Sequence, residues 1–170
     1  AIGNNGTAVF KGTGNLPPGI YAIFFPGKQL RTEFLIGNEQ VISVTADTSD
    51  LLNRTVVSGS KENILYDQYQ KVAATKGRLI YQERNAYTVS TTKADSVLHE
   101  KNYTTYTKEL NDYREGIIKN QPNSMMAALL NAMKEPVYPA KVPVTKQDSI
   151  NNYNEYKKHY WDGISFMDDR

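Results

Sequence analysis

The stretch Val56-Val57-Ser58-Gly59-Ser60-Lys61-Glu62-Asn63 decides the fold, because the chain changes character within it. The β-branched residues before Gly59 favour a strand. Ser60 is a suitable N-cap, and Glu62 lies favourably in the first turn of a helix. Most Gly and Phe residues precede this stretch, whereas eleven of the twelve Tyr residues follow it. The sequence therefore predicts an α+β fold, with a small antiparallel β unit over residues 1–59 and about four packed helices over residues 60–170.

Toward the N-terminus, short β-prone runs alternate with turn residues. Pro26-Gly27 closes one run, and Gly37-Asn38-Glu39 joins two others, so we expect a hairpin in which residues 32–36 pair with residues 40–46. Together the expected strands cover residues 8–12, 20–25, 32–36, 40–46 and 56–58. One face of such a sheet needs a covering layer, which the following helices are expected to provide. The contacts expected are those of Phe34, Ile36, Ile42 and Val44 with Leu65, Tyr69 and Val72.

Toward the C-terminus, apolar and aromatic residues recur at spacings of three and four, the period of a helix. The first helix begins at Ser60, and its end stays open because Gly77 and the β-branched run over residues 87–92 both disfavour helix. The second helix ends near Pro122. It carries one continuous stripe, made of His99, Tyr103, Tyr106, Leu110, Tyr113 and Ile117.

Two further helices follow. Ser124 caps a short third helix that stops before Pro136, with an expected apolar face of Met126, Leu129, Leu130 and Met133. Because proline cannot continue a helix, an extended linker is predicted over Pro136, Pro139 and Pro143. The fourth helix begins between Thr145 and Asp148, whose side chains are expected to pair as in a capping box. It presents Ile150, Tyr153, Tyr160 and Trp161.

Composition excludes several classes of function. The chain has no cysteine, so it cannot itself carry a disulfide framework, a thiolate nucleophile, Cys-ligated zinc or an iron–sulfur cluster. With 20 Lys and Arg against 18 Asp and Glu, the net charge of +2 is too small to predict a nucleic-acid partner. No apolar run approaches the roughly 20 residues that span a bilayer. We expect no cofactor, no metal ion and no membrane-spanning segment.

The strongest chemical candidate is the stretch Tyr156-Lys157-Lys158-His159-Tyr160-Trp161-Asp162. His159 and Asp162 lie three residues apart, so on a helix they could act as a base and its orienting carboxylate in a hydrolase. No Gly-x-Ser-x-Gly elbow or cysteine supplies a nucleophile, so an aromatic helix end that packs on a neighbour is favoured. The residues expected to contact a ligand or partner are Tyr156, His159, Trp161 and Asp162.

Other candidates have simpler interpretations. His99 precedes Glu100 but has no second His four residues away, so a histidine at the core edge is favoured over a metal ligand. The charges at Asp168, Asp169 and Arg170 are those of a solvated cluster more often than of a cation site. Tyr103, Tyr106 and Tyr113 are expected in the core, whereas Tyr66 and Tyr156 fall outside the main stripes and are expected at an exposed contact.

Four stretches together resemble a known family. They are residues 6–12 with 16–21, residues 32–40, residues 58–63 leading into Tyr69-Gln70, and Met133-Lys134-Glu135-Pro136 with the later residues 159–164 and 168–170. In order and spacing they are similar to the uncharacterised N-terminal module of exported TlpA/ResA-like, thioredoxin-family thiol–disulfide oxidoreductase proteins of gut-type Gram-negative anaerobes. The resemblance covers nearly the whole chain.

The resemblance implies a function and a location. It implies a non-catalytic accessory or interaction module, with a Cys-x-x-C thioredoxin-like domain after Arg170 as its partner, and other exported proteins as further partners. It implies the periplasm, or a lipid anchor on the exported side of the cell envelope, for a chain that begins after its signal peptide. No catalytic residue is carried over, because the active cysteines belong to the other domain. The alternative is an exported glycan- or peptide-binding module that uses exposed aromatics such as Tyr156 and Trp161.

Overall fold

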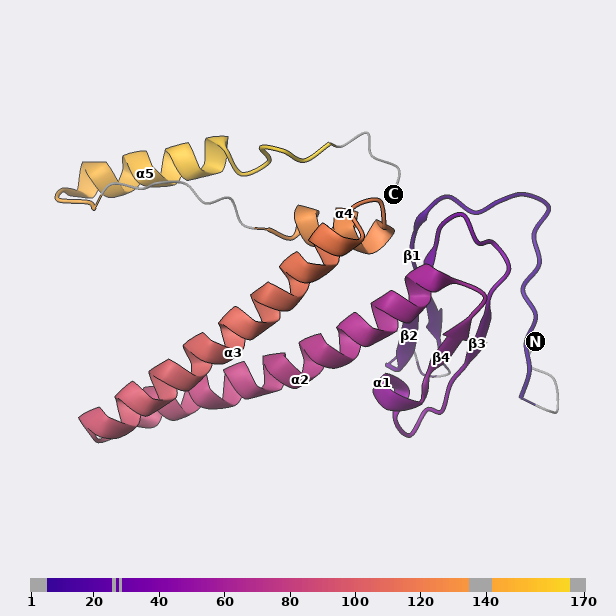
Figure 1. Ribbon diagram of the computed structural model, residues 1–170, viewed down its shortest axis with the longest axis horizontal. Coiled ribbons are helices and arrows are strands. Elements are labelled where there is room, and N and C mark those ends of the chain that lie inside the picture. The colour runs from indigo at the N-terminus through magenta and orange to yellow at the C-terminus, as the bar shows by residue number, and fades with distance from the viewer. Residues whose placement is uncertain (1–5, 26, 28, 135–141, 166–170) are drawn as a thin grey trace. The chain divides into compact units, whose positions relative to one another are not determined.

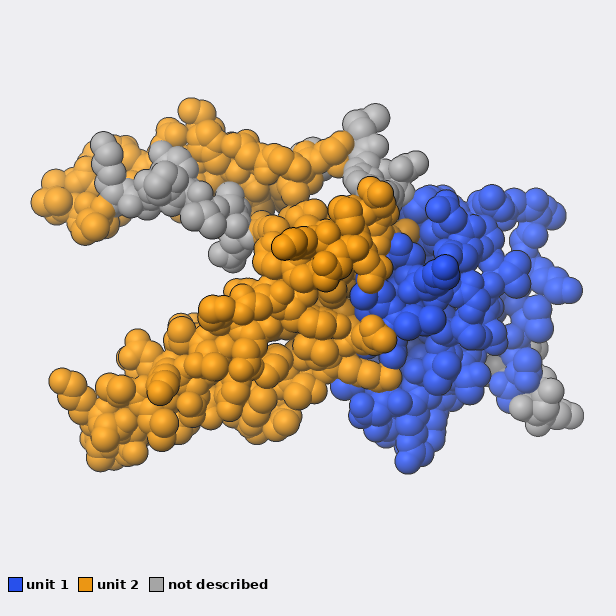
Figure 2. Space-filling view, in the orientation of Figure 1, with its two compact units in different colours: residues 1–67 blue, residues 68–170 orange. Residues whose placement is uncertain are grey.

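The computed structural model describes residues 6–25, 27, 29–134 and 142–165, and it confirms the α+β class (Figure 1). The elements are β1 (Gly19–Phe24), β2 (Arg31–Ile36), β3 (Ser43–Thr45), α1 (Leu51–Arg54), β4 (Val56–Ser58), α2 (Lys61–Val89), α3 (Lys93–Asn120), α4 (Met125–Ala132) and α5 (Lys146–Lys158). The chain forms two compact units, residues 1–67 and 68–170 (Figure 2). The β structure and the first turns of α2 belong to the first unit.

The strands of the first unit form two separate antiparallel sheets. β1 pairs with β2, which places Tyr21 opposite Phe34. Their rings are stacked, with centroids 6.3 Å apart. β3 pairs with β4 and places Val44 opposite Val57. The expected strands at 20–25, 32–36 and 56–58 are thus confirmed. The hairpin of 32–36 with 40–46 was wrong, since only residues 43–45 form a strand there and they pair with β4. The strand expected over residues 8–12 was also wrong.

The side chain of Asn63 explains why β2 does not pair with a following strand. Asn63 Oδ1 accepts a hydrogen bond from the backbone N–H of Leu35 at 2.7 Å, and its Nδ2 donates to the Leu35 carbonyl at 2.8 Å. The amide therefore occupies the edge of β2 in the way a neighbouring peptide group would. Both residues are only 1% exposed, so neither backbone group of Leu35 has water as an alternative partner.

One further contact caps the start of α2, and another binds it to β2. Ser60 Oγ accepts from the backbone N–H of Asn63 at 3.3 Å, which confirms Ser60 as the residue that caps the helix. Tyr66 is 6% exposed, and its hydroxyl donates to Glu33 Oε2 at 3.2 Å. The expectation that Tyr66 lies at an exposed contact was wrong, because its ring is buried while its hydroxyl finds a carboxylate on β2.

Gly59 makes the junction between β4 and α2 possible. Its φ is +89°, in the left-handed region that favours glycine. A Cβ at this position would lie 2.6 Å from the carbonyl oxygen of Val41. No other residue satisfies both conditions, so the sequence changes from strand to helix through a glycine.

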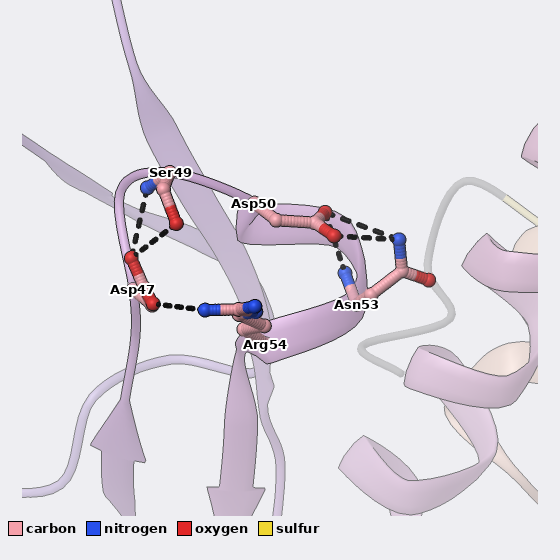
Figure 3. Close-up of polar contacts among 5 residues, drawn as sticks. All are labelled: Asp47, Ser49, Asp50, Asn53 and Arg54. Atoms are coloured by element: carbon pink, nitrogen blue, oxygen red, sulfur yellow. Dashed lines mark hydrogen bonds and ion pairs between the residues drawn. The ribbon is translucent and has the colours of Figure 1, made fainter.

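The short helix α1 was not predicted from the sequence. Asp50 caps it, with Oδ1 accepting from the backbone N–H of Asn53 at 3.2 Å (Figure 3). Just before it, Asp47 accepts hydrogen bonds from the side chain and backbone of Ser49 and pairs with Arg54 at 2.9 Å. The hydrogen bond from the Ser49 hydroxyl, followed by those from its backbone and from Arg54, lowers the pKa of Asp47. These short-range polar contacts hold the turn between β3 and β4.

The second unit contains the antiparallel pair α2 and α3. Arg114 Nε donates to the Tyr69 hydroxyl at 3.2 Å, Lys76 pairs with Glu109, and His99 Nδ1 lies 2.7 Å from Glu83. In these contacts the residue number on α3 decreases as the residue number on α2 increases, so the two helices run antiparallel. Gly77 lies inside α2, which runs as one helix to Val89, so the predicted obstacles at 77 and 87–89 do not end it.

The core of this unit is narrower than the sequence stripe predicts. On α3 only Leu110 and Ile117 are buried, while Tyr103, Tyr106 and Tyr113 are half-buried. The expectation of core tyrosines was wrong because a helix pair buries a narrow strip and leaves its flanks accessible. The Lys76 ammonium lies 5.3 Å from the centre of the Tyr106 ring, so this tyrosine makes a cation–π contact at the flank of the helix pair. His99 is half-buried beside Glu83 and Asn102.

The short helix α4 packs on α3 and closes this core. Ser124 caps it as predicted, with Oγ accepting from the backbone N–H of Ala127 at 3.0 Å. Its buried residues are Met125, Met126, Ala127 and Leu130, whereas Met133, expected on the apolar face, is exposed. Residues 135–141, which include Pro136 and Pro139 of the expected linker, lie outside the described residues. None of the helices searched, all within the described ranges, is apolar enough over sufficient length to cross a bilayer.

Replacement of Asn63 should destabilise the first unit. Asn63→Ala removes two hydrogen bonds and leaves the N–H and C=O of Leu35 buried without partners, so we expect a loss of about 2–4 kcal/mol in the free energy of unfolding. Urea unfolding followed by circular dichroism measures it. Asn38→Ala, at an exposed position, is the control and should change stability by less than about 0.5 kcal/mol. Equal effects of the two substitutions would contradict the role given to Asn63.

A pair of glycine substitutions should have opposite effects. Gly59→Ala places a Cβ against the Val41 carbonyl at an unfavourable φ and should cost at least about 1–3 kcal/mol. Gly77→Ala adds a Cβ in open space within α2 and should stabilise the helix by about 0.5–1 kcal/mol. Thermal unfolding of both variants against the parent chain tests the pair. A tolerated Gly59→Ala would show that the junction can relax.

Candidate functional site

The candidate site lies at the end of α5, and a capping box holds the start of this helix. Thr145 Oγ1 accepts from the backbone N–H of Asp148 at 3.1 Å, and Asp148 Oδ2 accepts from the backbone N–H of Thr145 at 2.7 Å. The predicted capping box is therefore present. The hydrogen bond from the Thr145 hydroxyl is the main cause that lowers the pKa of Asp148.

None of the residues of α5 is buried. Lys157 and Lys158 lie in its last turn, where positive charge is favourable beside the free carbonyl groups. Beyond His159 the chain continues in tight turns, with Asp162 N–H donating to the His159 carbonyl at 3.1 Å, and Gly163 has a φ of +78°. These turns bring residues 159–162 back beside the last turn of the helix.

An aromatic cluster forms on this scaffold. The rings of Tyr156 and Tyr160 meet edge to face with centroids 5.6 Å apart, and Tyr160 meets Trp161 in the same way at 4.7 Å. We call Tyr156, Tyr160 and Trp161 the aromatic end of α5. Edge-to-face pairs fix ring orientation, so the three rings form a shaped surface rather than independent side chains. Trp161 is 54% exposed, so much of that surface is open to a ligand or partner.

The four residues expected at a contact site are brought together in part. Tyr156 and Trp161 both contact Tyr160, which the site prediction did not include although it stands between them in the sequence. Tyr153 extends the same surface one turn earlier, is 61% exposed, and has Lys157 over its ring at 5.5 Å. The helical spacing of Tyr153, Tyr156 and Tyr160 carried the signal that these rings share a face.

His159 and Asp162 form the contact that their spacing predicts. Nδ1 of His159 lies 2.6 Å from Asp162 Oδ2, and Nε2 lies 3.7 Å from Glu155 Oε2. The side chain of Asp162 is 68% exposed and that of His159 is 39% exposed. A surface dyad lacks the water-excluded setting that hydrolytic catalysis uses. The arrangement therefore fits a polar rim beside the aromatic end of α5 better than a catalytic base.

Among residues 6–134 and 142–165, apart from positions 26 and 28, no group of three or more His, Asp or Glu side chains is placed to hold a metal ion. Asp168, Asp169 and Arg170, considered above as a charge cluster, lie outside the described residues.

Acid should loosen α5, because its capping carboxylate must lose its charge. The pKa of Asp148 in the folded chain lies below the ordinary value of 3.8. The ionised carboxylate therefore stabilises α5 fully above pH 3.8, and this stabilisation is lost as the pH falls through the lowered pKa. Thr145→Ala should raise this pKa toward 3.8 and cost the helix about 1 kcal/mol. Carboxyl NMR shifts of Asp148 and α5 amide shifts between pH 6 and about 2 measure both effects.

Ser149→Ala, in the same first turn at an exposed position, is the matched control for this capping prediction. It keeps both bonds of the capping box and should leave the titration unchanged. An Asp148 pKa that does not respond to Thr145→Ala would contradict the assignment of the cause.

Comparison with known proteins adds no assignment to these residues. The chain matches no family model, no curated protein and no solved structure. No residue role is therefore transferred to the aromatic end of α5 from another protein. The likeness to the N-terminal module of exported thioredoxin-like proteins remains a proposal based on the sequence.

Proposed function

We propose that this chain is a non-catalytic accessory module that holds a neighbouring thioredoxin-like domain of an exported thiol–disulfide oxidoreductase. The observation that carries the proposal is α5, a helix without a buried residue that ends in an exposed aromatic cluster. Isolated helices of this length are marginal in water, and most depend on packing of one face. A helix of this kind is a suitable contact for a second protein domain.

The composition of the surface supports a protein partner. Tyr and Trp are enriched where protein interfaces bury their central contacts, and the rings of Tyr153, Tyr160 and Trp161 are all exposed. Lys157, Lys158 and Asp162 surround them with charge, as in an interface with an apolar centre and a polar rim. The expected partner is the domain that the family resemblance places after Arg170. It would follow α5, the last helix, in the sequence.

Because the chain has no cysteine, the proposal assigns the redox chemistry to the partner domain. Thiol–disulfide exchange needs a thiolate, which this chain cannot supply. The partner domain would carry the Cys-x-x-C pair, and this chain would position it or present its substrates. Location in the periplasm, or on a lipid anchor at the exported side of the cell envelope, belongs to the same proposal.

A binding experiment tests the proposal directly. The reading frame after Arg170 is expressed as a separate unlabelled domain and titrated into the ¹⁵N-labelled 170-residue chain. We expect shifts concentrated in α5 amides, and Tyr153→Ala or Trp161→Ala should weaken binding by tenfold or more, as for central interface aromatics. Tyr81→Ala, on α2, is the matched control, because Tyr81 is 67% exposed and Tyr153 is 61% exposed. It should leave the affinity within about twofold.

Two results would overturn the proposal. One is a reading frame without a Cys-x-x-C domain, and the other is shifts that avoid α5 altogether. The exposure of Trp161 also favours a second candidate, binding of glycans or peptides on the aromatic end of α5. Quenching of the single tryptophan by an oligosaccharide or a short peptide, lost in Trp161→Phe, would favour that candidate instead.

A further inference from the structure

The hydrogen-bond pattern of β1 and β2 shows which groups face outward. At the hairpin end, the N–H of Phe25 donates to the carbonyl of Leu30 at 3.0 Å. Hydrogen-bonded and non-bonded pairs alternate along an antiparallel ladder. Since Phe24 pairs with Arg31 in the next position, the N–H and C=O groups of Ile20, Ala22 and Phe24 point away from β2.

The far edge of the same sheet agrees with this pattern. Leu35 is opposite Ile20, so its backbone groups must point away from β1, and they bond to the side chain of Asn63. One edge of the sheet is therefore closed by an amide. On the other edge, along β1, the outward N–H and C=O groups of Ile20, Ala22 and Phe24 have no hydrogen-bond partner among the described residues.

This open edge is also apolar. The side chains of Ile20 and Phe24 are about half exposed, with Ala22 between them, and no charged residue lies in β1. An unpaired edge of this kind is a template for another strand. A two-stranded sheet is marginal alone, so a third strand on β1 would add the pairing it lacks.

The chain carries a segment that matches this edge. Residues 8–12 have a strand-like sequence, yet they form no ladder, and Val9 and Phe10 are 71% and 81% exposed. The backbone that leads from this segment into β1 is bound by the side chain of Gln40. Leu16 donates its N–H to Gln40 Oε1 at 2.9 Å, and Gln40 Nε2 donates to the Leu16 carbonyl at 3.2 Å. Residues 8–12 themselves do not pair with β1 of their own chain.

We infer that residues 8–12 of one copy add as a strand to the outer edge of β1 in a second copy of this chain. Donor and acceptor lie on the same chain, so two copies can exchange segments reciprocally about a two-fold axis and leave neither edge open. The added strand gives partners to the outward groups of Ile20, Ala22 and Phe24 and covers Val9 or Phe10. The surface involved shares no residue with α5, so this inference stands apart from the proposed function.

Cross-linking tests the pairing, because the chain has no cysteine of its own. Chains carrying Val9→Cys or Phe10→Cys are each mixed with a chain carrying Ala22→Cys under oxidising conditions. Because side chains alternate across a strand, one of the two mixtures should give a disulfide-linked heterodimer several times faster than the other. A single chain that carries both cysteines of the faster pair then shows whether the added strand comes from a second copy or from the same chain. Covalent dimers support the inference, and disulfides confined to monomers overturn it by showing that the segment folds onto its own chain.

Sedimentation equilibrium provides the second measurement. The parent chain should form a concentration-dependent dimer, and a parent chain that remains monomeric up to about 1 mM would overturn the inference. Phe10→Asp and Ala22→Pro should each raise the dimer dissociation constant at least tenfold. The proline removes an outward N–H and leaves the bonds to β2 intact. Val142→Asp, at an 87% exposed position outside the helices and strands, is the control and should not change it.

Discussion

The bidentate contact between Asn63 and Leu35 is the constraint on which the β unit depends. One amide side chain at the first turn of α2 satisfies both backbone groups of a buried strand residue. It orients the helix start against β2, and it excludes a further strand from that edge. Gly59 belongs to the same constraint, because only a glycine lets the chain pass Val41 and reach Asn63 in four residues. Burial of Leu35, Ile36 and Leu65 adds stability to the same arrangement.

The second unit is organised by different interactions. Its paired helices have a thin apolar core and several ion pairs and cation–ring contacts along their flanks. Glu83 illustrates the mixture, since the hydrogen bond from His99 lowers its pKa while Asn102 binds the same carboxylate oxygen. Exposed ion pairs of this type contribute little individually. The apolar contacts of Leu110, Ile117 and α4 therefore supply most of the cohesion of this unit.

Local signals predicted much of the fold, and long-range pairing accounts for most of the errors. Ser60, Ser124 and the Thr145–Asp148 pair were identified as helix starts because capping involves residues only three positions apart. The partner of β2 was wrong, since the competing contact comes from Asn63, which is 28 residues beyond Leu35. At the candidate site, spacing along one helix predicted the His159–Asp162 contact, whereas Tyr160 was overlooked as the ring that joins Tyr156 to Trp161.

The absence of buried residues in α5 has a consequence for affinity. A helix without buried residues depends strongly on its capping box, so loss of that box would lower the fraction of time for which the aromatic end of α5 is assembled. Any partner that needs the assembled form binds with an apparent affinity reduced by that fraction. Under the proposed function, Thr145 and Asp148 would therefore set the binding strength from positions eight or more residues before the rings. Changes at the cap would tune recognition without altering a single contact atom.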